Sequence, residues 1–148
     1  MIGYHSLNED VLPLPKQPKR VPDEIGDLSD ICSEVLCQQM AEWAGWAAYV
    51  ESVLSDLDKH VLTLQLRYDI AFGAAMSNMR KEHGKISLTE LKALALGEEE
   101  VNKLNVTLLE QRARYAKLKS LVQGYDRKYN CLSRELSRRM NEANKLRH

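Results

Sequence analysis

Residues 101–139 read VNKLNVTLLEQRARYAKLKSLVQGYDRKYNCLSRELSRR, and this stretch decides the fold. Side chains that are apolar or tyrosine recur along it at steps of three and four without slipping, and only Gln111 and Arg139 break the chemical pattern. The full series is Val101, Leu104, Leu108, Gln111, Tyr115, Leu118, Val122, Tyr125, Tyr129, Leu132, Leu136 and Arg139. A seven-residue repeat over five heptads predicts a long helix wound against a partner helix.

A second helical pattern precedes this one in the chain. Apolar residues from Trp43 onward step by threes and fours, and the pattern extends from about residue 28 to residue 79. Asp27 and Ser29 are the candidate N-caps of this helix, because short polar side chains accept hydrogen bonds from its first amide groups.

The polar stretch RKEHGKIS, residues 80–87, is the predicted turn between the two helices. Ser87 and Glu90 follow the spacing of a capping box, in which each side chain accepts a hydrogen bond from the other residue's backbone. The second helix is therefore predicted over about residues 88–146. Gly45, Gly73 and Gly97 are the positions where the two long helices could bend.

These patterns predict an all-α fold, a long antiparallel helical hairpin with coiled-coil packing. Two partners are open for the seam, namely the first helix folded back or a neighbouring subunit, and we expect both. A bare two-helix hairpin buries only one stripe per helix, so a homo-oligomer is expected to complete the core. The predicted core and oligomer seam comprises Trp43, Trp46, Tyr115, Leu118, Val122, Tyr125, Tyr129, Leu132 and Leu136.

Residues 1–27 differ from the rest because four prolines fall within LPLPKQPKRVP. Proline fixes φ and lacks an amide donor, so this segment is predicted to be an extended or disordered tail. The alternative interpretation is a docking peptide with Val11, Leu12 and Leu14 as its anchors.

Composition narrows the function classes. No apolar run approaches the roughly 18 residues of a membrane span, and no signal peptide is visible. The three cysteines are odd in number and not spaced for a metal, which is typical of a cytoplasmic protein with reduced thiols. No metal-ligand cluster, phosphate loop or catalytic motif is present, so we expect neither a cofactor nor an enzyme.

A net charge of zero hides a strong asymmetry. Residues 111–148 hold eleven basic and three acidic side chains, and the first 110 residues hold ten basic and eighteen acidic ones. Within the basic third, Arg127, Arg134, Arg138 and Lys145 share the helix face opposite the seam, where they could follow phosphates along a nucleic-acid strand. The other cations of this third that we include in a nucleic-acid site are Arg112, Arg114, Lys117, Lys119, Lys128 and Arg139.

Two alternatives stand beside nucleic-acid binding for this basic third. The arginines would also suit pairing with acidic helices of a neighbouring copy, or a simple solvated face. The interleaved tyrosines, Tyr115, Tyr125 and Tyr129, could stack on unpaired bases, but their seam positions favour packing in a core.

The order and length of these segments resemble a known family. WAGWAAYVESVL (43–54) is followed by LQLRYDIAFG (64–73), a short loop, and then the long segment from LKALALG (91–97) to Leu136. This arrangement is similar to the UvsY family of phage recombination mediators over roughly residues 40–140. The resemblance implies a small helical protein that binds single-stranded DNA, assembles as a ring and helps a RecA-like recombinase displace single-strand-binding protein.

The family's basic motif, a lysine and an arginine two apart, falls on Gln65 and Arg67 here, so only Arg67 matches. The basic second helix is therefore the better DNA-binding candidate in this chain. The resemblance also implies the cytoplasm as its location, that of the host if a phage encodes it.

The leading hypothesis is a non-catalytic single-stranded DNA-binding recombination mediator that self-assembles. The first alternative is a structural or scaffold coiled-coil protein, of the virion or adaptor type, that binds no nucleic acid. A second alternative is a small inhibitor or adaptor that acts through the proline-rich tail.

Overall fold

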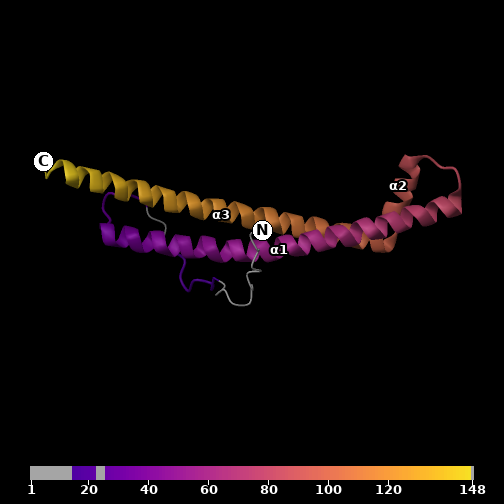
Figure 1. Ribbon diagram of the computed structural model, residues 1–148, viewed down its shortest axis with the longest axis horizontal. Helices are drawn as coiled ribbons and strands as arrows, with labels where there is room; N and C mark the ends of the chain where they lie inside the picture. The colour runs from indigo at the N-terminus through magenta and orange to yellow at the C-terminus, as the bar shows by residue number, and fades with distance from the viewer. Residues whose placement is uncertain (1–14, 23–25, 148) are drawn as a thin grey trace, which may run out of the picture. The chain divides into compact units, whose positions relative to one another are not determined.

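The computed structural model describes residues 15–22 and 26–147 and contains three helices, α1 (Ser33–His83), α2 (Leu88–Gly97) and α3 (Glu99–Lys145) (Figure 1). No strand occurs in these ranges, so the predicted all-α class is confirmed. The proposed anchors of the tail, Val11, Leu12 and Leu14, lie outside the described residues.

The chain divides into two compact units. The first unit comprises the residues up to Val53 and those from Ser120 on, and the second unit comprises Leu54–Lys119. Each of the two long helices contributes one half to each unit.

The start of α1 lies five residues later than the sequence predicts. Asp27 does not cap the helix, because its carboxylate accepts hydrogen bonds from the amide (2.9 Å) and the hydroxyl (2.7 Å) of Ser29 in a tight turn. The helical hydrogen bonds begin with the amide of Leu36 donating to the carbonyl of Cys32 at 3.1 Å. The predicted N-caps therefore form a turn before the helix and do not start it.

The end of α1 lies four residues beyond the predicted end, at His83. Gly84 terminates it with a φ of +67°, a conformation that glycine adopts without steric cost, while its amide still donates to the carbonyl of Arg80. Arg80, Lys81 and His83 occupy the last turn, where cations complement the helix dipole. The predicted turn thus shortens to the residues that follow His83.

The helix predicted over about 88–146 is divided at Glu98, which has an extended conformation with φ −60° and ψ 132°. The capping box at its start is confirmed, with Ser87 and Glu90 each accepting from the other's backbone. Gly97 is a poor helix former, and the carboxylates of Glu99 and Glu100 favour the start of a new helix. The division precedes Val101, so the seven-residue repeat lies wholly within α3.

In the first unit, the start of α1 packs antiparallel against the end of α3 (Figure 1). Leu36, Trp43 and Leu132 form the buried cluster, with Met40 and Tyr125 packed against it. The Trp43 and Tyr125 rings stack with their centroids 5.4 Å apart. The seam of this unit is therefore filled from within the chain.

In the second unit, α2 closes the end of the pair made by α1 and α3. Ala95 of α2 lies in a buried cluster with Ala75 of α1 and Val101 of α3. Phe72 packs against this cluster and stacks on Tyr68, with a centroid separation of 5.7 Å. Small side chains at these positions let the three helices approach closely.

Candidate nucleic-acid interface

The outward side of α3 in the first unit carries the basic face, which we define as Arg127, Arg134, Arg138 and Lys145. All four side chains are exposed. The three arginines line one open groove of about 480 Å³, together with Asn130, Cys131, Glu135 and Leu28. The structure thus brings together three of the cations that the sequence placed on one helix face, because their steps of seven and four match the helical repeat.

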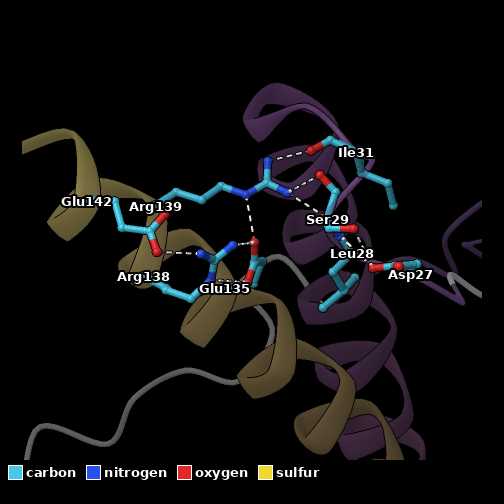
Figure 2. A network of polar contacts seen from close by, with 8 residues as sticks. All are labelled: Asp27, Leu28, Ser29, Ile31, Glu135, Arg138, Arg139 and Glu142. Carbon is cyan, nitrogen blue, oxygen red and sulfur yellow. Dashed lines mark hydrogen bonds and ion pairs between the residues drawn. The ribbon is translucent and has the colours of Figure 1, made fainter.

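Arg138 is already paired with two carboxylates of α3, which makes it a weaker phosphate contact than its spacing alone suggests. Its Nε and Nη2 donate to the two carboxylate oxygens of Glu135 at 2.9 and 2.7 Å, and its Nη1 donates to Glu142 at 2.6 Å (Figure 2). Both carboxylates lie one helical turn away, where such pairs form readily. Hydrogen bonds to Glu135, and then to Glu142, raise the pKa of Arg138 and so favour its charged form, while the two carboxylates offset that charge within α3.

Arg139 has a structural position, which also corrects its inclusion among the DNA-binding cations. Figure 2 shows its guanidinium directed at the turn before α1, where it donates to the carbonyls of Ile31 and Leu28. Its Nε also donates to Glu135 at 2.8 Å. The side chain is only 20% exposed. Arg139 therefore ties the end of α3 to the start of the helical region.

Glu135 lies between the two arginines and gives this cluster a defined pH dependence. Hydrogen bonds from Arg138, and then from Arg139, lower the pKa of Glu135 from 4.5 to about 2. A carboxylate whose pKa is lowered by folding stabilises the folded state above its unfolded-state pKa and loses that contribution as pH falls toward the folded value. The stabilisation is therefore present above about pH 4.5 and is lost between pH 4.5 and 2.

We expect the variant Glu135→Gln to flatten this part of the stability profile. Urea unfolding followed by circular dichroism between pH 2 and pH 6 measures it. Glu51→Gln, which changes an exposed glutamate of the same unit, is the matched control and should keep the wild-type slope. Equal slopes for Glu135→Gln and the wild type between pH 4.5 and 2 would contradict the assigned role of Glu135.

The remaining predicted cations divide between the two units. Lys128 lies over the Trp43 ring, 4.3 Å from its centroid, as a cation–π contact. Arg112 donates to the side-chain carbonyl of Gln65 in the second unit. The exposed cations Arg114, Lys117 and Lys119 also lie in the second unit.

Arg67, the residue that matches the family motif, lies in unfavourable surroundings for a phosphate. It is exposed and lines a separate groove of about 620 Å³ whose other polar walls include Glu82, Glu98 and Glu100. Three carboxylates near one guanidinium repel a polyanion. The geometry therefore favours the basic face over Arg67.

The seam residues are mostly covered, which decides between the two interpretations of the tyrosines. Tyr125 is held between Trp43 and Trp46, whose centroids lie 5.4 and 6.4 Å from its own. Tyr129 is 38% exposed and borders a shallow groove with Trp43. Val122 and Leu132 are buried, and Tyr115, Leu118 and Leu136 are half-buried. Among the three tyrosines only Tyr129 is open enough to stack on a base.

One contact was missed by sequence reasoning. The indole Nε1 of Trp46 donates to the carbonyl of Arg20 at 2.7 Å, and a Cβ built on Gly45 would lie 3.7 Å from Pro18 Cγ. Pro22 is buried. Residues 15–22 therefore lie against α1 without forming a helix or strand of their own. The signal available in the sequence was Trp46 itself, because a tryptophan that packs in a core needs an acceptor for its indole N–H.

Within residues 15–22 and 26–147, no helix combines the length and apolar character needed to cross a bilayer. No group of three or more potential ligand side chains in the same ranges is arranged to hold a metal ion. Comparison of the sequence with known families and curated proteins, and of the fold with solved structures, found no match.

Proposed function

We propose that this chain binds single-stranded DNA without sequence preference, through the basic face, and acts as a non-catalytic recombination mediator. Phosphate contacts dominate the affinity of such binding, and they require cations that are exposed and not already neutralised. Only some of the predicted cations meet this condition, and those cations form the proposed DNA-binding site.

The observation that carries the proposal is the exposure of Arg127 and Arg134 and their availability for a phosphate. Both are exposed in the same groove, seven residues apart on α3, and neither has an ion-pair partner among the residues described. Two helical turns separate them by about 10 Å along the axis, a span that one or two nucleotides of an extended strand can bridge. Lys145 continues the same face toward the end of α3.

The charge balance of the two long helices in the first unit supports the same assignment. Residues 120–147 carry seven basic and three acidic side chains, whereas the α1 segment 33–53 carries three acidic and no basic ones. Residues 15–22 add three further basic side chains to this unit. Of the two long helices, α3 is therefore the one that would attract a polyanion.

The partners beyond DNA come from the resemblance alone. A RecA-like recombinase and single-strand-binding protein would be the partners of a mediator, and the cytoplasm its location. Stimulation of recombinase ATP hydrolysis on DNA already coated with single-strand-binding protein tests this part of the proposal, whereas DNA binding is tested by the experiment below.

We expect the double variant Arg127→Gln/Arg134→Gln to bind a fluorescently labelled oligo-dT at least about tenfold more weakly at low salt, because two phosphate contacts are lost. Fluorescence anisotropy measures the affinity over a salt series. The slope of log affinity against log salt should fall by about 0.7 for each contact removed.

The matched control is Arg80→Gln/Lys81→Gln, which removes the same charge from the exposed last turn of α1. It should change the affinity less than about twofold, since these cations lie outside the basic face. Absence of binding at low salt, insensitivity to salt, or equal losses in both double variants would refute the proposed site. A parallel titration with oligo-U compares DNA with RNA.

A scaffold protein without nucleic-acid binding is the second candidate. The observation that favours it is that Arg138 is bound by Glu135 and Glu142, and Arg139 by Glu135 and the Ile31 carbonyl, so both arginines are engaged within the chain. This candidate predicts that the chain assembles fully and that oligo-dT leaves both its mass and its anisotropy unchanged.

A further inference from the structure

The half of α1 that lies in the second unit has two apolar stripes. The inner stripe is buried and includes Leu57 and Leu64. The outer stripe consists of Leu62, Leu66 and Ile70, which are spaced by four and are 63%, 61% and 65% exposed. At 3.6 residues per turn the two stripes fall on opposite sides of the helix.

An apolar row of this kind is unusual on a free surface. Single exposed leucines are common, but three consecutive turns that present large aliphatic groups typically mark a contact surface. The seam of α3, which was the expected oligomer contact, is covered within each unit by α1. The outer stripe of α1 is therefore an exposed apolar surface on which a second copy could dock.

The residues that flank the outer stripe identify a second copy as its occupant. We infer that residues 55–73 of α1 pair antiparallel, about a twofold axis, with the same residues of another chain. In this register Leu62 meets the partner's Leu66, and Lys59 meets the partner's Asp69. The symmetry generates each contact twice, so the opposite charges at positions 59 and 69 complement each other at both ends of the leucine contacts.

The charges that flank the stripe favour this register over one in which a residue of the stripe meets the same residue of the other chain. Lys59 and Asp69 are exposed and lie ten residues apart, or about 15 Å along the axis, so they cannot pair within one chain. In the single chain Asp69 accepts a hydrogen bond from Gln65 at 2.7 Å, and Lys59 has a contact of its own. Both residues would exchange these partners for each other on association.

At both ends of the paired segment, this register brings small residues together. Ser55 meets the partner's Gly73, and both residues are exposed. A Cβ built on Gly73 would have no neighbour within 4 Å, so the surface there is open to an approaching helix. Small residues at both ends allow the two backbones to come close while the leucines fill the centre.

This pairing does not depend on the proposed DNA binding, because it uses a different unit and no cation of the basic face. Its first test is the native mass of the full chain without nucleic acid, measured by light scattering after size exclusion. We expect about twice the chain mass of 16.9 kDa. Leu66→Asp should give the single-chain mass. Leu109→Asp, which changes an exposed leucine of α3 in the same unit, should leave the dimer intact.

The register has a sharper test in charge reversal. Lys59→Glu and Asp69→Lys should each weaken dimerisation at least about tenfold, because each places two like-charge pairs in the contact. The double variant restores opposite charges and should return to within about threefold of the wild type. Glu82→Lys, on the last turn of α1, is the charge-reversal control and should have no effect on mass.

Circular dichroism separates loss of pairing from loss of folding, since every substituted side chain is exposed in the single chain. A wild-type chain that stays monomeric up to about 100 µM, a value typical of a weak association, overturns the inference. So does an assembly that Leu66→Asp leaves intact, or a double charge reversal that fails to recover dimerisation.

Discussion

Replacing Trp43 by alanine is expected to lower the free energy of unfolding by about 3–5 kcal/mol, the range for deleting a large aromatic side chain from a core. Trp43 is only 4% exposed and touches both helices of the first unit. The substitution removes the stack with Tyr125 and the cation–π contact with Lys128 as well as the buried apolar area. Urea unfolding followed by circular dichroism measures the loss.

Because the chain has two compact units, the loss should be uneven along it. Hydrogen exchange read by mass spectrometry should rise in residues 33–53 and 120–145, and much less in 57–110. Trp43→Phe is the control, since it keeps an aromatic ring in the cluster and should cost about 1–2 kcal/mol. A uniform rise in exchange along the whole chain would contradict the division into units.

Replacing Arg139 by methionine is expected to cost about 2 kcal/mol, the second largest loss among these substitutions. Methionine keeps much of the aliphatic length but leaves the carbonyls of Leu28 and Ile31 without their charged donor. The turn that precedes α1 should then open. Thermal unfolding and hydrogen exchange at residues 28–36 measure both effects.

Arg138→Met provides the matched control for this prediction. The two arginines are adjacent and both bind Glu135, but the side chain of Arg138 is 52% exposed and donates to Glu135 and Glu142 of its own helix α3. Exposed ion pairs one turn apart contribute little, so we expect a loss below about 1 kcal/mol. Equal losses for the two variants would show that the bonds of Arg139 to the start of the helical region do not stabilise the fold.

The regular parts of the fold were predictable because they follow from periodicity. The seven-residue repeat assigned Val122 and Leu132 to the interior, and both are buried. The helix boundaries were harder to predict from the sequence, since they depend on which side chains compete for the backbone hydrogen bonds at each helix end. Asp27 accepts a hydrogen bond within a turn and does not cap the helix that follows. Glu98 interrupts the predicted second helix at a point that the apolar pattern does not mark.

The candidate site was likewise predictable only in part. Helical spacing correctly grouped Arg127, Arg134 and Arg138 on one face, as the shared groove shows. Spacing alone does not reveal which guanidinium groups are neutralised, because that depends on the rotamers of Glu135 and on backbone carbonyls more than 100 residues away in sequence. Arg139 carried a usable signal, since it occupies the twelfth position of the apolar series and therefore had to face the interior.

The location of the two tryptophans has a practical consequence for spectroscopy. Trp43 and Trp46 are the only indoles in the chain, and both belong to the first unit. Intrinsic fluorescence excited near 295 nm therefore reports on one end of each long helix and is blind to α2 and its surroundings. A melting curve recorded by emission and one recorded by ellipticity will coincide only if the two units unfold together, so the pair of curves measures their cooperativity without any label.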